Sequence, residues 1–202
     1  MDNTYREKKS KISVRALCSV AMLSAIAFVL MYIEVPAILM PSFIKLDVSD
    51  LPALIGTFTF GPIAGLLIEV IKNLLHLPFS QTFGIGELSN ALLGIAFVVP
   101  AGIIYNKNKT KKTAIVASLV GAAIMAILSF PINYFIVYPA YYNFLSEAAI
   151  VKMYQVICPA VKNISQCLLV FNVPFTFVKA MICVIITVFV YKPLSPLLKG
   201  RH

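Results

Sequence analysis

The sequence predicts an all-α integral membrane protein, one domain over residues 1–202, with six transmembrane helices and both termini in the cytoplasm. Its 202 residues are 60% hydrophobic and only 12% charged, with a mean hydropathy of +0.91. Soluble domains are more polar, so this composition excludes an ordinary cytosolic protein. At roughly 20 residues per crossing, the length allows about five to seven spans and leaves no room for a second domain.

Long apolar runs predict where the helices lie. They cover residues 12–33, 51–75, 88–105, 113–138 and about 168–191. The first run is too long for the apolar core of a signal peptide, so we interpret it as the first helix. Gly61-Pro62 interrupts the second run, and a proline disfavours a helical residue before it. This run therefore crosses the membrane either once or, with a reversal at Gly61, twice.

The basic residues decide between five and six crossings. They cluster at the N-terminus, at residues 107–112 and at the C-terminus. Cytoplasmic segments carry such an excess of Lys and Arg, and the three clusters share one side only if 51–75 crosses out and back. The net charge of +9 is therefore a topology signal, and we expect no nucleic-acid partner.

The two halves of the second run predict a pocket. At 1.5 Å per residue they are about 15 Å and 22 Å long, short of a hydrocarbon core of about 30 Å. Helix ends inside a membrane must be sheltered by protein or line a cavity. We expect this pocket in the outer half, roofed by the loops 34–50, 76–88 and 139–167, with a lid or interfacial helix at 144–157.

Polar residues at membrane depth are candidate ligand contacts, because burying a charge there costs about 2.5–3.5 kcal/mol. Lys179 and Thr176 share a face of the last helix, and Asn133 lies near the outer end of the fifth. Each position also has a structural explanation. Lys179 could snorkel outward, and Asn133 could bond to a neighbouring helix.

The third and fourth helices carry further candidates. Glu69 and Lys72 are spaced to form an ion pair near the outer end of the third helix. Alternatively, Asn73 or Lys72 reaches the pocket. Glu87 begins the fourth helix, where a favourable interaction with the helix dipole explains it as well as a ligand contact does. These positions predict polar groups near the pocket without settling their roles.

The chain lacks the motifs of a membrane enzyme. It has no P-loop and no HExxH, and His76 and His202 are its only histidines, which excludes a two-histidine metalloprotease. Its four cysteines show no metal spacing. We therefore expect no catalytic residues, no metal site and no catalytic cofactor.

Motifs along essentially the whole chain match one family of membrane proteins. They are Lys45-Leu-Asp-Val-Ser-Asp-Leu-Pro52, Gly61-Pro62, Glu69-Val-Ile-Lys-Asn73, Gly86-Glu-Leu-Ser-Asn90 and Pro174-Phe-Thr-Phe-Val-Lys179. Together they resemble the riboflavin-binding S components of energy-coupling factor (ECF) vitamin transporters. The resemblance implies the six-helix S-component fold in a bacterial cell membrane, with a vitamin site near the extracellular surface.

The resemblance also implies roles for single residues. Lys179 and Asn133 match positions that hydrogen-bond to the isoalloxazine ring of the transported ligand, riboflavin or its phosphate FMN. Thr176 stands where the family usually has Asn. The segment around Ile44, Leu46 and Asp47 would cover the ligand, and Glu87 and Asn73 complete the candidate set.

The implied partners are an energising module and the membrane lipid. A coupling transmembrane subunit and two ATPase subunits would supply the energy, and the S component would topple in the membrane to deliver its vitamin. Ala21 and Ala25 resemble the family's contact motif for the coupling subunit, because small residues allow a helix to approach closely. Two alternatives stay open: an S component for thiamine, folate or a pyridine derivative, and a helical membrane subunit unconnected with transport.

Overall fold

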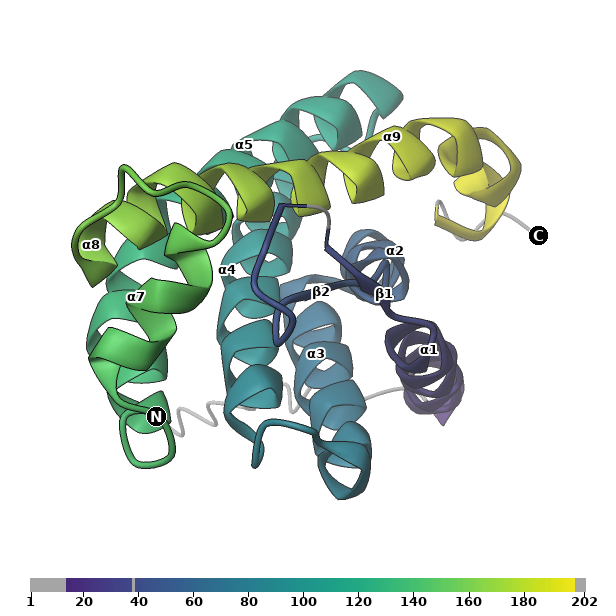
Figure 1. Ribbon diagram of the computed structural model, residues 1–202. Coiled ribbons are helices and arrows are strands. Elements are labelled where there is room, and N and C mark those ends of the chain that lie inside the picture. Colours follow the sequence, from purple (N-terminus) through teal and green to yellow (C-terminus); the bar gives the residue numbers. More distant parts are fainter. Residues whose placement is uncertain (1–13, 38, 199–202) are drawn as a thin grey trace, which may run out of the picture.

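The computed structural model describes residues 14–37 and 39–198, with side chains up to residue 190. These described residues are mostly helical and include one small hairpin (Figure 1). Most of the N-terminal and C-terminal basic clusters lies outside the described residues, so their predicted placement is not visible. The helices are α1 (Val14–Tyr32), α2 (Asp50–Phe60), α3 (Pro62–His76), α4 (Ile85–Lys107), α5 (Lys111–Ile132), α6 (Tyr138–Tyr141), α7 (Glu147–Gln155), α8 (Ile164–Cys167) and α9 (Val173–Leu198). A two-stranded antiparallel hairpin, β1 (Val35–Pro36) and β2 (Lys45–Leu46), joins α1 to α2.

The reversal predicted at Gly61 is confirmed. Gly61 has φ 98° and separates α2 from α3, and Pro62 opens α3. A positive φ suits glycine because it has no Cβ. The two helices then pack closely side by side, since a Cβ on Gly65 would lie 1.7 Å from Thr57 Oγ1 and one on Gly56 would lie 2.3 Å from Ile68 Cδ1.

Five helical segments among the described residues are long and apolar enough to cross a membrane. They are Val14–Tyr32, Pro62–Phe79, Ile85–Lys107, Lys111–Tyr141 and Ile164–Val190. Three of them start earlier than predicted, and local capping explains the difference. Gly84, with a positive φ, precedes α4, which begins ahead of residue 88. The side chains of Thr110 and Asn163 accept hydrogen bonds from Thr113 N and Gln166 N at the starts of α5 and α8.

Two of these long helices contain a π turn. The first, η2 (Asn133–Val137), connects α5 to α6, and the second, η3 (Leu168–Asn172), connects α8 to α9. Each is followed two residues later by a proline, Pro139 or Pro174. A proline ring clashes with the carbonyl four residues before it and cannot donate to it, so a locally widened turn allows the helix to continue.

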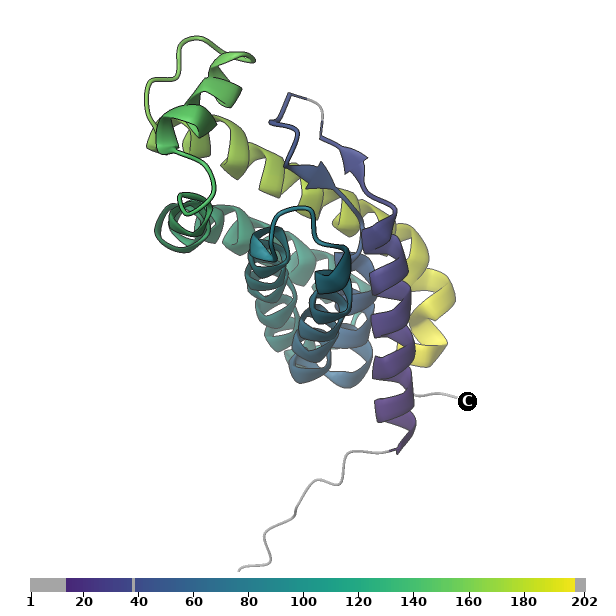
Figure 2. The ribbon, with the colours of Figure 1, turned by 60° about the horizontal axis from the view of Figure 1, so that its bottom comes forward.

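The core lies between α4 and its neighbours α2, α3 and α5, with α9 packed against α5 and α2. A second apolar cluster joins α6, α7 and α8, in which Ile150 and Tyr154 of α7 are completely buried. The helix predicted at 144–157 thus exists as α7. Figure 2 shows that α7 and the β1–β2 hairpin lie toward the same end of the molecule, away from the start of α1.

Candidate functional site

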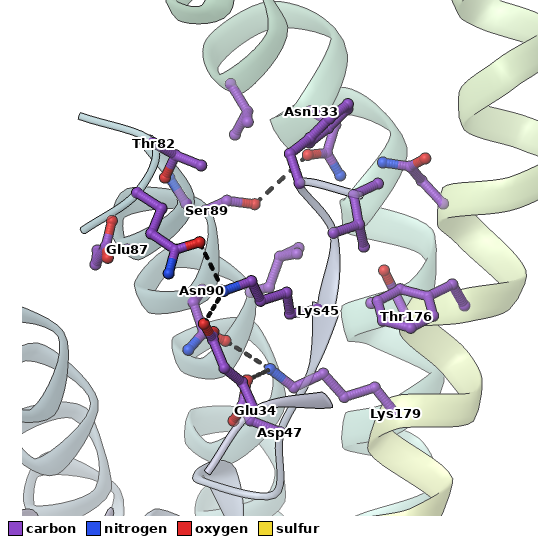
Figure 3. A pocket seen from close by; sticks show the side chains of 18 of the residues that line it. Glu34, Lys45, Asp47, Thr82, Glu87, Ser89, Asn90, Asn133, Thr176 and Lys179 are labelled. Atoms are coloured by element: carbon purple, nitrogen blue, oxygen red, sulfur yellow. Dashed lines mark hydrogen bonds and ion pairs between the residues drawn. The ribbon is translucent and has the colours of Figure 1, made fainter. Parts of the chain in front are cut away.

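A cavity of about 360 Å³ opens beneath the hairpin. Its walls come from the ends of α1 and α3, the hairpin, the loop before α4, α4 itself, α5 with its π turn, α6 and α9 with its π turn. Figure 3 shows side chains from these elements converging on it. Binding sites for small molecules have volumes of this order and combine apolar walls with a few oriented polar groups.

Lys179 lies at the base of the cavity within a polar cluster. Its ammonium donates to Asp47 Oδ2 at 2.9 Å and to Asn90 Oδ1 at 2.7 Å (Figure 3). Burial alone would raise the pKa of Asp47, but the ammonium groups of Lys179 and Lys72 outweigh it and lower that pKa to about 2. Lys179 is therefore held by an internal carboxylate, rather than reaching outward to the membrane surface.

Behind this cluster lies a second, fully buried one. The Lys72 ammonium contacts Asp50 Oδ1 at 2.6 Å, Glu69 Oε2 at 2.8 Å and Ser49 Oγ at 2.8 Å. The predicted Glu69–Lys72 pair thus exists, but it includes Asp50 and none of its side chains is exposed. Gly94 of α4 makes room for it, because a Cβ there would lie 2.2 Å from Glu69 Oε2.

Glu87 lines the cavity and bonds to the loop between α3 and α4. Its carboxylate oxygens lie 2.8 Å from His76 Nδ1 and 2.7 Å from Ser80 Oγ. Both Glu87 and His76 are buried. The carboxylate therefore fixes the loop to the end of α3 and to the start of α4.

The hairpin covers the cavity and is held at its edges. Lys45 forms an ion pair with Glu34 and donates to Gln81 Oε1 at 3.0 Å (Figure 3). The ring of Phe43 packs against that of Tyr141 with centroids 5.5 Å apart. These contacts join the hairpin to the end of α1, to the loop before α4 and to α6.

Two asparagines project into the cavity from the π turns. Asn133 Nδ2 donates to the Ser129 carbonyl at 2.8 Å, and Ser89 Oγ donates to Asn133 Oδ1 at 3.5 Å. Asn172 Oδ1 accepts from the hydroxyl of Tyr154 at 2.6 Å. Burial raises the pKa of Tyr154, so its hydroxyl remains a donor.

Six of the eight predicted ligand residues line this cavity, namely Lys179, Asn133, Thr176, Glu87, Ile44 and Asp47. The other two lie outside its lining. Leu46 is the second residue of β2, next to Lys45 in the hairpin. Asn73 donates to the Glu69 carbonyl at 2.8 Å within its own helix. Sequence reasoning missed Asn172, although its place one helical turn before Thr176 puts both on the same face of the helix.

The predicted docking pair lies on an exposed face of α1. Ala21 and Ala25 are exposed, whereas Val20, Ser24 and Ala27 of the same helix are buried. The exposed face thus presents two small residues, one turn apart.

The cavity lining combines paired charges with amides and apolar walls. The two ammonium groups in the cavity lining, Lys45 and Lys179, each contact a carboxylate of the same lining. Within the described residues, no group of three or more His, Cys, Asp or Glu is placed to hold a metal ion. The site offers paired charges, amides and apolar walls, which suit a planar polar ligand without net charge.

Comparison with known proteins places the chain among membrane transporters. A family model described as "ECF transporter, substrate-specific component" matches residues 15–191. The riboflavin transporter RibU of Staphylococcus aureus is 36% identical, with 96% of this chain and 97% of that one covered. The riboflavin transporter FmnP of Bacillus subtilis is 30% identical, with 95% of this chain and 97% of that one covered. A solved structure of the S component of a bacterial ECF transporter superposes with a TM-score of 0.71 at 32% identity, covering 92% of this chain and 98% of the other.

Proposed function

Because the chain belongs to the family of ECF transporter substrate-specific components, we propose that it is the riboflavin-binding subunit of a vitamin uptake transporter. It is a multi-pass protein of the bacterial cell membrane. The observation that carries the proposal is the cavity, which lies under a covering hairpin in a chain similar over its whole length to two riboflavin transporters. Riboflavin is here the transported ligand and not a catalytic cofactor.

The lining of the cavity supports this choice of ligand. A flavin has apolar ring faces and a uracil-like edge of alternating hydrogen-bond acceptors and a donor. Leu93, Met125 and Phe175 line the cavity and suit the faces, and an asparagine suits the edge because it both donates and accepts. Asn133 and Lys179 bind the edge in this proposal, and Thr176 contributes one hydroxyl.

The remaining candidates have supporting roles. Ile44 and Asp47 belong to the segment that covers the ligand, and Glu87 holds the loop beside it. Leu46 and Asn73 act indirectly, Leu46 through the hairpin and Asn73 within α3.

The proposal includes six crossings, in which α2 and α3 together traverse the membrane out and back. Both termini and the basic turn between α4 and α5 are then cytoplasmic, and the hairpin faces the exterior. Figure 2 supports this orientation, because the hairpin lies far from the start of α1. The cavity then receives its ligand from outside.

The chain works with an energising module in this proposal. A coupling transmembrane subunit and two ATPase subunits supply the energy, and the exposed Ala21 and Ala25 allow the coupling subunit to approach α1 closely. The S component then topples in the membrane and delivers the vitamin inward.

The absorbance spectrum of the purified protein tests the proposed ligand. Expressed in flavin-replete cells, the protein should be yellow with a flavin spectrum, and the ligand-free protein should bind added riboflavin in a fluorescence titration. A colourless preparation that also leaves riboflavin fluorescence unchanged would contradict the function.

A further inference from the structure

Asn172 and Asn133 both reach the cavity from π turns, on two different helices. Asn172 is the last residue of η3 and Asn133 the first of η2, and both are buried and line the cavity. π turns redirect side chains and are frequent at functional sites. The two amides therefore come from the same kind of local distortion on two different helices.

Two tyrosines hold the Asn172 amide in place. Tyr154 donates to Asn172 Oδ1 at 2.6 Å, and Asn172 Nδ2 donates to the Tyr138 hydroxyl at 3.2 Å. The two tyrosine hydroxyls also contact each other, so the three side chains close a ring of hydrogen bonds. Each hydroxyl can both donate and accept, so the ring holds the plane of the amide in place and occupies one amide N–H and one lone pair of the amide oxygen.

Tyr154 contributes to this ring from outside the cavity. It belongs to α7, its side chain is completely buried in the second apolar cluster, and it is absent from the cavity lining. Asn172 and Tyr138 both line the cavity. Tyr154 can therefore influence a ligand only through them.

The Asn172 amide keeps hydrogen-bonding capacity for a ligand. An amide can donate twice and accept twice, and the ring of hydrogen bonds among these described residues uses one N–H and one lone pair of Asn172. The remaining N–H and lone pair form a donor and an acceptor in a fixed amide plane. Such a pair matches the alternating edge of a flavin ring better than a freely rotating hydroxyl would.

We propose that Asn172 binds the polar edge of the flavin ring and that Tyr154 is a positioning residue that orients it. This proposal rests on the riboflavin-binding function. It adds a ligand contact in α9 and gives α7 a role in recognition as well as in packing.

A double-mutant cycle on riboflavin affinity tests the proposal. Wild type, Tyr154→Phe, Asn172→Ala and the double variant are purified in detergent and titrated by flavin fluorescence. Tyr142→Phe is the matched control, because Tyr142 is more than one-third exposed and lies outside the cavity lining. Thermal unfolding of each ligand-free protein checks that it is folded. The visible absorption bands of the bound flavin provide a second readout, because they respond to hydrogen bonds at the ring.

We expect Asn172→Ala to weaken riboflavin binding about tenfold, and Tyr154→Phe about fivefold, which is the usual range for one neutral hydrogen bond. In the Asn172→Ala background, Tyr154→Phe should change the dissociation constant less than about twofold, since its effect acts through Asn172. Asn172→Ala should also shift the bands of the bound flavin, whereas Tyr142→Phe should change neither readout.

Several results would overturn the proposal. An unchanged affinity and spectrum in Asn172→Ala removes the ligand contact, and additive effects in the cycle remove the positioning role of Tyr154. If Tyr154→Phe fails to fold, Tyr138→Phe takes its place in the cycle. Because Tyr138 itself lines the cavity, its effect should then shrink, and not vanish, in the Asn172→Ala background, and a fully additive effect again removes the positioning role. Failure of the wild-type protein to bind riboflavin would instead refute the function and this proposal together.

Discussion

Lys179 and Asp47 are 132 residues apart in the sequence, yet the Lys179 ammonium lies 2.9 Å from Asp47 Oδ2. Both side chains are almost completely buried. The contact joins the segment between the hairpin and α2 to the last long helix, at the base of the cavity. A covering segment and a ligand-contacting helix are thus fixed to each other by one ion pair.

Removing only one partner of this pair should be costly. Lys179→Ala leaves Asp47 buried without its ammonium, so we expect a loss of about 3–5 kcal/mol in stability and at least tenfold weaker riboflavin binding. Asp47→Asn combined with Lys179→Met should recover much of the stability but not the affinity. Thermal unfolding and fluorescence titration measure the two effects, with the exposed Lys162→Ala as control. Unchanged affinity in Lys179→Ala would remove Lys179 from the site.

The contribution of Asp47 to stability should depend on pH only in acid. Its pKa is lowered from 3.8 to about 2, so the folded state binds its proton less readily than the unfolded state does. The stabilisation is therefore fully present above about pH 4 and is lost as the pH falls toward 2. We expect the difference in melting temperature between wild type and Asp47→Asn to be constant from about pH 5 to 8 and to shrink below about pH 4. A difference that already changes between pH 6 and 8 would contradict this.

The cavity should prefer riboflavin to its phosphate. Lys45 and Lys179 each already contact a carboxylate, and Glu87 adds further negative charge to the lining. A phosphate would meet carboxylates without an uncommitted ammonium among these residues, so we expect FMN to bind at least about tenfold more weakly. Glu34→Gln removes the carboxylate that pairs with Lys45 and should reduce the difference in affinity between riboflavin and FMN. Competition titrations of wild type and variant measure this difference. Equal affinities in the wild type would refute the argument.

Gly94 should be among the least replaceable glycines. A Cβ there would lie 2.2 Å from Glu69 Oε2, inside a buried charge cluster that cannot move freely. Gly94→Ala should destabilise the protein by about 2 kcal/mol or more, because it displaces a paired carboxylate. Gly61→Ala is the comparison: its Cβ has space, with Asn106 Nδ2 at 3.7 Å, and its cost of about 1–3 kcal/mol comes from the backbone alone, because φ 98° with ψ 171° is a conformation that essentially only glycine adopts. A Gly94→Ala variant that melts at the wild-type temperature would contradict this account.

Much of the fold could be predicted from the sequence, because its signals are local. The long apolar runs predicted the long helices, and Gly61-Pro62 predicted the reversal, since glycine and proline act on their own backbone. The site was less accessible. Asp47, Lys179 and Asn90 come together from three distant segments, and no spacing in the sequence indicates that they meet.

Asn172 was missed for a related reason. Its direction depends on a π turn, and its orientation depends on Tyr154 from another helix. Neither feature has a periodic pattern that the sequence displays. Asn73 illustrates the converse, since a polar residue at suitable depth bonds to its own helix instead of lining the cavity.

The exposed small residues of α1 predict a separation between binding and transport. Ala21 and Ala25 lie one turn apart on an exposed face and outside the cavity lining. Leucine at both positions would hold a neighbouring helix farther away, and it would leave the buried residues Val20, Ser24 and Ala27 untouched. We therefore expect Ala21→Leu with Ala25→Leu to retain riboflavin affinity within about twofold in purified protein, since an exposed substitution rarely alters a distant site. Riboflavin uptake by cells that carry the transporter should fall at least about tenfold, because the coupling subunit can no longer approach.

Met22→Leu, an exposed change on the same helix without loss of a small residue, is the control and should transport normally. Normal uptake by the double leucine variant would show that the coupling subunit docks elsewhere, and loss of both uptake and binding would show that this face of α1 supports the site itself.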